Sequence, residues 1–220
     1  MNEKILVTAP KLHPEGVKLL NAMVCQVFYL DANGTAEDVE RLMASQAIAA
    51  VISRTVNLSE QAILGCPTLK VISKHGVGVS NINVEAATKR GIPVYVTPGA
   101  NAQSVAEMTM GLLFSAARKI SWMDQALRKG IWARAQNGIE LKGKTIALVG
   151  IGQIGQIVAK VCQALGMKVV AFDPAHGLNA PIQDVQMFGS LDDMLPQANV
   201  LSLHVPLNKH TRGLVGADQL

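Results

Sequence analysis

Short apolar segments recur along the chain and alternate with segments whose apolar residues are spaced three or four positions apart. Residues 145–149 are β-branched or apolar without alternation, which is typical of a parallel strand buried on both faces. Between 154 and 165 the apolar residues form a stripe at helical spacing. Residues 168–172 then read as a second buried strand. We therefore predict a strand, a helix and a parallel strand over this region.

The same alternation extends over residues 1–98, where turn residues bound the short apolar runs. Thr35 is placed to cap a helix that begins at Ala36, with Asp38 three positions later in a loose form of the capping box. Alternating strands and helices imply a parallel sheet with helices on both faces. We predict strands at 4–9, 24–30, 49–53, 69–74 and 93–96, and helices at 14–23, 36–45, 59–64 and 84–89.

A long apolar stretch, residues 102–120, separates the two α/β regions. Its polar members (Gln103, Ser104, Glu107, Arg118 and Lys119) favour a buried helix between domains over a membrane span. Beyond it we predict helices at 124–129 and 191–195, a turn-rich segment at 174–184, a strand at 199–205 and the start of a further element at 211. The sequence thus predicts two α/β domains, residues 1–98 and 99–220.

Three glycines follow the strand at 145–149 at once. Gly150, Gly152 and Gly155 have the spacing G-x-G-x-x-G, which gives a tight turn, a close backbone approach to a diphosphate, and close packing of helix on strand. The free amides and the helix dipole at that point favour an anion. Asp173 ends the second strand, 18 positions after Gly155, where a carboxylate can accept both hydroxyls of an adenosine ribose. These residues predict a dinucleotide site.

The acidic residue also indicates which dinucleotide is bound. A carboxylate repels a 2′-phosphate, and the residues after Asp173 offer no Arg or Lys to bind one, so NAD is favoured over NADP. His176 is the one nearby residue that complicates this preference.

A second glycine loop, KHGVG at 74–78, follows the predicted strand at 69–74. Gly76 and Gly78 flank Val77 and free the backbone to turn its amides toward one point, a small nest suited to a carboxylate or a phosphate. Lys74 and His75 lie beside it. The residues fit equally well a tight turn with a solvated lysine and a hydrogen-bonded histidine.

Composition narrows the remaining function classes. Almost half of the 220 residues are hydrophobic and 16% are charged, as in a well-packed soluble protein. The net charge of +4 is spread without a run of Lys or Arg, which argues against a nucleic-acid surface. Three cysteines without C-x-x-C spacing suggest neither a disulfide framework nor a metal site. No stretch reads as a signal peptide or a membrane span, so we expect a cytoplasmic protein.

The chain resembles the D-isomer-specific 2-hydroxyacid dehydrogenases, and the D-3-phosphoglycerate dehydrogenases among them most of all. The resemblance covers essentially the whole chain and is carried, in order, by KHGVGVSNINVEAATKRGIPVYVTPGANAQSVAEMTMGLL, LKGKTIALVGIGQIGQIVAK, FDPAHG and LSLHVPLNKHTRGLV. It implies a flavodoxin-like substrate-binding domain at 1–98 and a Rossmann NAD domain at 99–220 that includes the linking helix. In the family these domains flank a cleft, and chains form homodimers through the nucleotide domain and its linking helix.

The resemblance also implies roles for single residues. Val77 and Gly78 match backbone donors to the substrate carboxylate, and Lys74 stands where many relatives have a basic side chain near the substrate. Asn101 and Ser104 match a loop at the floor of the cleft. The expected substrate-binding set is Lys74, Gly76, Val77, Gly78 and Asn101. The expected cofactor-binding set is Ser104, Gly150, Gly152, Gln153, Ile154, Gly155, Asp173, Val205 and Pro206.

The family's catalytic Arg, Glu and His all fall after the position that matches Leu220, so we expect no catalytic residue in this chain and a C-terminally incomplete NAD domain. His204 ends a strand near the expected cleft, but the family pattern makes it cofactor lining. The implied activity is hydride transfer between a nicotinamide and a D-2-hydroxy acid or 2-keto acid. Hydroxypyruvate, glyoxylate, phosphoglycerate and bulkier keto acids all remain open as substrates.

Three hypotheses remain. The first is a fragment, or an incomplete copy, of an NAD-dependent dehydrogenase whose active form is longer. The second is an NAD(H)-sensing, corepressor-like binding protein without dehydrogenase activity. The third is a decayed, inactive chain.

Overall fold

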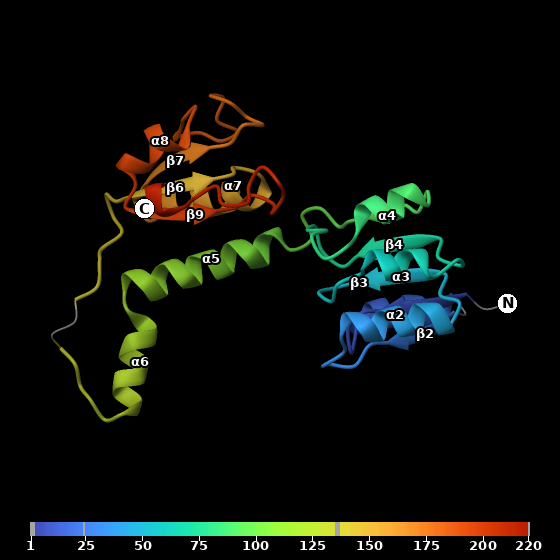
Figure 1. The fold of residues 1–220 in the computed structure, drawn as a ribbon. Coiled ribbons are helices and arrows are strands. Elements are labelled where there is room, and N and C mark those ends of the chain that lie inside the picture. The colour runs from blue at the N-terminus through green and yellow to red at the C-terminus, as the bar shows by residue number, and fades with distance from the viewer. Residues whose placement is uncertain (1–2, 24, 135–136, 220) are drawn as a thin grey trace. The chain divides into compact units, whose positions relative to one another are not determined.

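The computed structural model describes residues 3–23, 25–134 and 137–219, and these form two compact units. The first unit is Met1–Pro98 and the second is Gly99–Leu220. Figure 1 shows strands and helices alternating along the first unit, whereas the second begins with two successive helices, α5 (Ala102–Ala117) and α6 (Ile120–Arg128).

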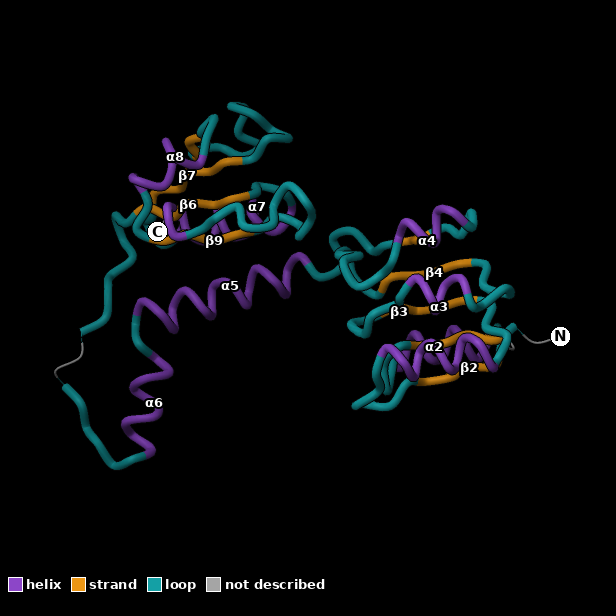
Figure 2. The backbone as a smooth tube through the Cα atoms, viewed as in Figure 1, coloured by secondary structure: helices purple, strands orange, loops and turns teal. Residues whose placement is uncertain are grey.

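The first unit contains a five-stranded parallel sheet in the order β2-β1-β3-β4-β5 (Figure 2). Apolar residues of α2, α3 and α4 pack against the sheet in one core, which includes Leu6, Met43, Ile63 and Ile72. The strands are β1 (Lys4–Val7), β2 (Gln26–Tyr29), β3 (Ala50–Ser53), β4 (Val71–Lys74) and β5 (Val94–Tyr95). The helices are α1 (Pro14–Ala22), α2 (Ala36–Ser45), α3 (Glu60–Leu64) and α4 (Val84–Lys89).

Local sequence signals set the helix boundaries in this unit. The predicted capping box of α2 is confirmed: the Asp38 amide donates to Thr35 Oγ1 over 3.3 Å, and the Thr35 amide donates to Asp38 Oδ2 over 2.9 Å. Strand ends are less well predicted. Each strand is shorter than its apolar run, since the run continues into the adjoining turn. The prediction for β2 also included Val24, which lies outside the described residues.

The second unit contains a four-stranded parallel sheet in the order β8-β7-β6-β9. Its strands are β6 (Thr145–Val149), β7 (Lys168–Phe172), β8 (Val185–Met187) and β9 (Val200–Leu203). Its helices are α5 (Ala102–Ala117), α6 (Ile120–Arg128), α7 (Gln153–Ala164) and α8 (Leu191–Met194), with short 3₁₀ turns η1 (Leu195–Gln197) and η2 (Ala217–Gln219). The four residues from Ile146 to Val149 are buried, as their unbroken apolar run predicted.

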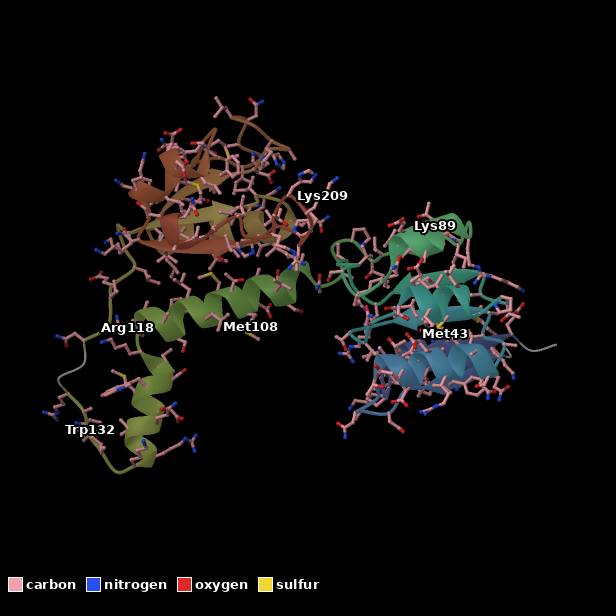
Figure 3. The ribbon with its side chains drawn as sticks, in the orientation of Figure 1. Met43, Lys89, Met108, Arg118, Trp132 and Lys209 are labelled. Atoms are coloured by element: carbon pink, nitrogen blue, oxygen red, sulfur yellow. The ribbon has the colours of Figure 1, made fainter. Side chains whose placement is uncertain are left out.

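Several predictions for this unit were wrong. The helix predicted at 124–129 is α6, which begins at Ile120 and ends at Arg128. The helix predicted over 102–120 ends at Ala117, and Lys119 has a φ of 53°, so the chain turns before α6 begins. One face of α5 packs on α7, but Met108 on that helix is 64% exposed, so the helix is not buried all round (Figure 3). The strand β8 was missed because its three residues, VQM, are too few to show a strand pattern.

Within the described ranges, no helix combines the length and the apolar character needed to cross a bilayer.

Candidate cofactor and carboxylate sites

The glycine turn after β6 is packed backbone against backbone. Gly150 has a φ of 93°, and a Cβ atom there would lie 2.7 Å from the carbonyl oxygen of His204. A Cβ atom on Gly155 would overlap the carbonyl oxygen of Gly150. Both positions therefore exclude a side chain, and the turn is fixed by close contact of β6, α7 and the end of β9.

The turn presents free backbone amides at the start of α7. Gly152 is the N-cap and supplies no capping side chain. Its amide and those of Gln153 and Ile154 donate to no group in the part of the chain that the structure describes. A Cβ atom on Gly152 would meet nothing within 4 Å, so the turn is open on this side. Unpaired amides at the positive end of a helix dipole are the groups that bind a diphosphate.

Asp173, at the end of β7, is bonded to that same turn. Its Oδ2 accepts a hydrogen bond of 2.9 Å from the Ile151 amide, and its Oδ1 accepts one of 2.9 Å from the Ala175 amide. Burial alone would raise the pKa of Asp173, but these two amides and the neighbouring His176 lower it below its ordinary value. The carboxylate is therefore charged at neutral pH. Each of its oxygens keeps a lone pair for a ribose hydroxyl.

His176 lies against the same carboxylate. Its Nδ1 is 3.3 Å from Asp173 Oδ2, yet it makes no hydrogen bond with any described residue. His176 thus lies beside the carboxylate expected to bind the ribose, and its effect on the choice between NAD and NADP stays a prediction.

The end of β9 adjoins the glycine turn. The His204 amide donates to the Val149 carbonyl over 2.7 Å, and Val205 packs against the core on that side of the sheet. His204 Nε2 and Ser202 Oγ are 3.0 Å apart. Burial lowers the pKa of His204, so its ring is neutral at pH 7. Pro206 follows, and its carbonyl accepts a 2.5 Å hydrogen bond from Thr211 Oγ1, which closes the loop after it.

An apolar groove of this unit lies away from the glycine turn. This groove of about 750 Å³ runs between α5 and β9, lined by apolar residues such as Leu112, Leu113 and Leu201, and it reaches His204. Neither the three motif glycines nor Asp173 lines it, so the groove is distinct from the dinucleotide turn.

The glycine loop after β4 is tied at its first glycine. Gly76 has a φ of 138°, and its amide donates to Lys74 O and to Thr97 Oγ1. The Thr97 amide donates back to Gly76 O over 2.9 Å. The next two amides, of Val77 and Gly78, have no partner among the residues described, and Val77 is 45% exposed. Two neighbouring free amides at the carboxyl end of a parallel strand fit the predicted nest.

Lys74 is buried beneath this loop, with 8% of the residue exposed. Its ammonium donates to the carbonyl of Arg54 and, over 2.6 Å, to Asn81 Oδ1. Burial lowers the pKa of Lys74. The alternative of a solvated lysine is therefore wrong, whereas direct contact of Lys74 with a substrate stays a prediction.

Two predicted residues lie at the start of α5. Asn101 is the N-cap of the helix, makes no side-chain capping bond, and is exposed, as is Ser104. The side chain of Gln153, on α7, lies against Gly99 at the entry to α5. The structure thus brings the start of α5 next to the dinucleotide turn.

Sequence reasoning missed two groups that shape these sites. The amide of Ile151 fixes Asp173 from within the glycine motif, and Asn81 anchors the loop after β4. Asn81 was visible as a polar residue in KHGVGVSNIN, but an asparagine in a loop reads first as a turn residue.

Residues 110–220 match the model of the D-isomer specific 2-hydroxyacid dehydrogenase NAD binding domain. The glyoxylate reductase of Thermococcus litoralis is 30% identical over 228 aligned positions, which cover the whole of this chain and 69% of the relative. The chain belongs to the D-isomer specific 2-hydroxyacid dehydrogenase family. The domain of this family that it matches binds NAD.

Two other similar proteins show how much of a longer chain this sequence covers. The D-3-phosphoglycerate dehydrogenase of Methanocaldococcus jannaschii is 38% identical over 219 residues, which cover 99% of this chain and 41% of the relative. This chain therefore spans about two fifths of that protein. The NAD⁺-bound 3-phosphoglycerate dehydrogenase of Entamoeba histolytica superposes with a TM-score of 0.83 at 27% identity, over 100% of this chain and 68% of that one.

Proposed function

We propose that this chain is the cofactor-binding and carboxylate-binding part of an oxidoreductase that transfers a hydride between NAD and a D-2-hydroxy acid or 2-keto acid. One observation supports this above the others. The free amides of Gly152, Gln153 and Ile154 and the charged carboxylate of Asp173 are joined through the Ile151 hydrogen bond into one surface. That surface fits a diphosphate and an adenosine ribose.

When bound, NAD supplies or accepts the hydride. The residues of this chain bind and orient. The amides of the turn and the dipole of α7 bind the diphosphate, Asp173 binds the ribose hydroxyls, and Val205 and Pro206 border the site at the end of β9. On the first unit, the amides of Val77 and Gly78 bind the substrate carboxylate. Holding the reactants in place in this way removes much of the entropic barrier to transfer.

We assign the hydroxyl proton to none of the described residues. His204 is the histidine that ends a strand, but its ring is neutral and half-buried beside Ser202, and no described carboxylate contacts it. A catalytic histidine needs a partner that orients it and a pKa near the working pH.

For the substrate class we propose small 2-keto acids, with 3-phosphohydroxypyruvate, hydroxypyruvate and glyoxylate as the first compounds to test. The names of the relatives support this choice: D-3-phosphoglycerate dehydrogenase at 38% identity and glyoxylate reductase at 30%. A carboxylate next to the reacting carbon is common to all three, and the two free amides of the KHGVG loop fit that group.

The deciding experiment first measures the intact mass of the purified protein. It then follows NADH oxidation at 340 nm with these three acids, with NADPH as the comparison cofactor. Oxidation of NADH with at least one acid supports the proposal. A protein that neither oxidises nor binds NADH would contradict it.

A second candidate function is NADH sensing by a corepressor-like binding protein. It is favoured because the free amides of the turn and the charged Asp173 would bind NADH in a sensor as well as in an enzyme. A sensor binds NADH, oxidises it with none of the acids, and changes its elution volume on a sizing column when NADH is added.

We further propose that the chain forms a homodimer through α6 and the segment that follows it. Apolar side chains are exposed there, among them Leu127 and Trp132, and Trp132 is 72% exposed (Figure 3). Exposed apolar residues gathered in one place mark interaction surfaces. Light scattering should give twice the monomer mass for the wild type, and Leu127→Glu should give the monomer mass.

We propose a cytoplasmic location as well. The three cysteines Cys25, Cys66 and Cys162 are all free thiols, and a reducing compartment keeps them so.

A further inference from the structure

The two free amides of the KHGVG loop lie between two anchored points. On one side, Gly76 is bonded in both directions to Thr97. On the other side, the loop is bonded to the segment after β3: the Leu58 amide donates to Asn81 O over 2.8 Å, and the Asn83 amide donates to Leu58 O over 3.0 Å. Val77 and Gly78 make no backbone bond of their own within the described chain. Their positions therefore depend on these anchors.

The second anchor has a buried polar centre formed by Asn81 and Lys74. Asn81 Nδ2 donates to Val56 O over 2.8 Å, to Ser53 Oγ over 3.1 Å and to Arg54 O over 3.3 Å. Asn81 Oδ1 accepts from Lys74 Nζ, which also donates to Arg54 O. Ser53 is fully buried and Lys74 nearly so. The pair thus joins the loops that follow β3 and β4, the two neighbouring strands of the sheet.

The bonding of Lys74 distinguishes two roles for it. An ammonium has three N–H donors, and two of them are directed at Arg54 O and Asn81 Oδ1, inside the unit. A residue that binds substrate directly would instead leave its charged end open to solvent. These two hydrogen bonds in a buried site make the connection between the two loops rigid and specific.

We propose that Lys74 and Asn81 are positioning residues: they hold the free amides of Val77 and Gly78 in the geometry that binds a carboxylate, and Lys74 acts through the loop without touching the substrate. This inference rests on the proposed function for its ligand class, but the state of the loop itself is measurable without any ligand.

The test uses the full chain labelled with ¹⁵N, with the amide signals of Val77 and Gly78 as reporters. In the free protein, Lys74→Met should shift both signals, because Asn81 Oδ1 loses its donor and Arg54 O loses one of its two. Glyoxylate, titrated as the probe, should then bind about tenfold more weakly. The NADH dissociation constant should be unchanged. Lys74→Arg keeps a cation with several donors and should restore most of both properties.

Lys70→Met is the matched control. Lys70 lies just before β4, is exposed, and pairs with Glu3 over 2.6 Å at the surface. It should leave the two signals and the glyoxylate constant at their wild-type values. Asn81→Leu should reproduce the effects of Lys74→Met, and the double variant should be little worse than either, because both changes remove the same anchor.

Ser53→Ala covers the case in which Lys74→Met does not fold. It deletes one acceptor of Asn81, so the same two signals should shift in the same direction by less.

The outcomes separate the two proposals. If Lys74→Met binds glyoxylate more weakly while its Val77 and Gly78 signals in the free protein are unshifted, Lys74 contacts the substrate directly and this inference is overturned. If Lys74→Met does not fold, unshifted Val77 and Gly78 signals in free Ser53→Ala overturn it. If the Val77 and Gly78 signals of the wild-type protein do not shift when glyoxylate is added, the proposed function of the loop is overturned instead.

Discussion

The glycine turn after β6 and the glycine loop after β4 both follow a parallel strand and both present free amides, yet different contacts fix them. Backbone atoms fix the first: Gly150 lies against His204 O, and Gly155 lies against Gly150 O. Side chains fix the second, through Lys74, Asn81 and Thr97. A Cβ atom on Gly78 would meet nothing within 4 Å.

The difference follows from what each loop precedes. The turn after β6 enters α7 directly, so helix and strand must pack closely and only hydrogen atoms fit between them. The loop after β4 runs seven residues before Ile82 forms a bridge with Leu58, in the segment after β3. It therefore has room for side chains and needs their hydrogen bonds for rigidity. The first loop is therefore sensitive to added volume, and the second to lost hydrogen bonds.

The largest effect should come from adding volume to the first loop. Gly155→Val places a side chain against the Gly150 carbonyl, which should cost about 3 kcal/mol of unfolding free energy. NADH binding should fall below detection, because the turn moves. Thermal unfolding and calorimetric NADH titration measure the two effects.

Gly152→Ala is the control for that change. Its Cβ has free space and its φ is −68°, so stability should stay within about 0.5 kcal/mol of wild type while NADH binds more weakly. Equal destabilisation by both variants would remove the distinction between the two glycines.

Removing the carboxylate of the first site should have the next largest effect. Asp173→Ser deletes a charged acceptor of ribose hydroxyls, so the dissociation constant for NADH should rise about thirtyfold. That for NADPH should change less, because the repulsion of its 2′-phosphate disappears at the same time. Fluorescence titration with each cofactor measures the ratio, and Asp192→Ser, at an exposed position of α8, is the control. Equal losses for both cofactors would contradict the ribose role.

The second loop offers a matched pair of glycines. Gly76 has a φ of 138°, so Gly76→Ala should cost about 1–3 kcal/mol through backbone strain. Gly78→Ala has neither strain nor a steric contact and should cost less than about 0.5 kcal/mol. Chemical denaturation compares them. If the two variants prove equally stable, local backbone strain is not what Gly76 relieves.

Most of the fold could be predicted from the sequence because apolar runs and helical stripes are local. The helices α2 and α4 and the strands β6 and β7 begin and end where their sequence patterns predicted. Failures came where tertiary packing decides. The end of α5 at Ala117 depends on the turn at Lys119, and no glycine or proline lies there to indicate it in the sequence.

The candidate site divides in the same way. The residues of G-x-G-x-x-G and Asp173 could be predicted because a fixed spacing sets their geometry, and the Ile151 bond to Asp173 is consistent with that geometry. The orientation of Lys74 could not. Its partners Arg54 and Asn81 are 20 and 7 positions away, and only the pairing of β3 with β4 brings them together.

The smallest predicted effect is a pH dependence at Lys74. Burial places its folded-state pKa below the ordinary value of 10.5, whereas the unfolded chain keeps that value. Between the two values the unfolded state binds more protons, so the Lys74 contribution makes the unfolding free energy rise with pH there. The stability of wild type relative to Lys74→Met should therefore increase as pH approaches 10.5, and relative to Lys70→Met it should not. Urea denaturation of the three proteins from pH 7 to 10 measures this, and a difference that falls with pH would show that Lys74 is stabilised in its charged form by the bonds to Arg54 and Asn81.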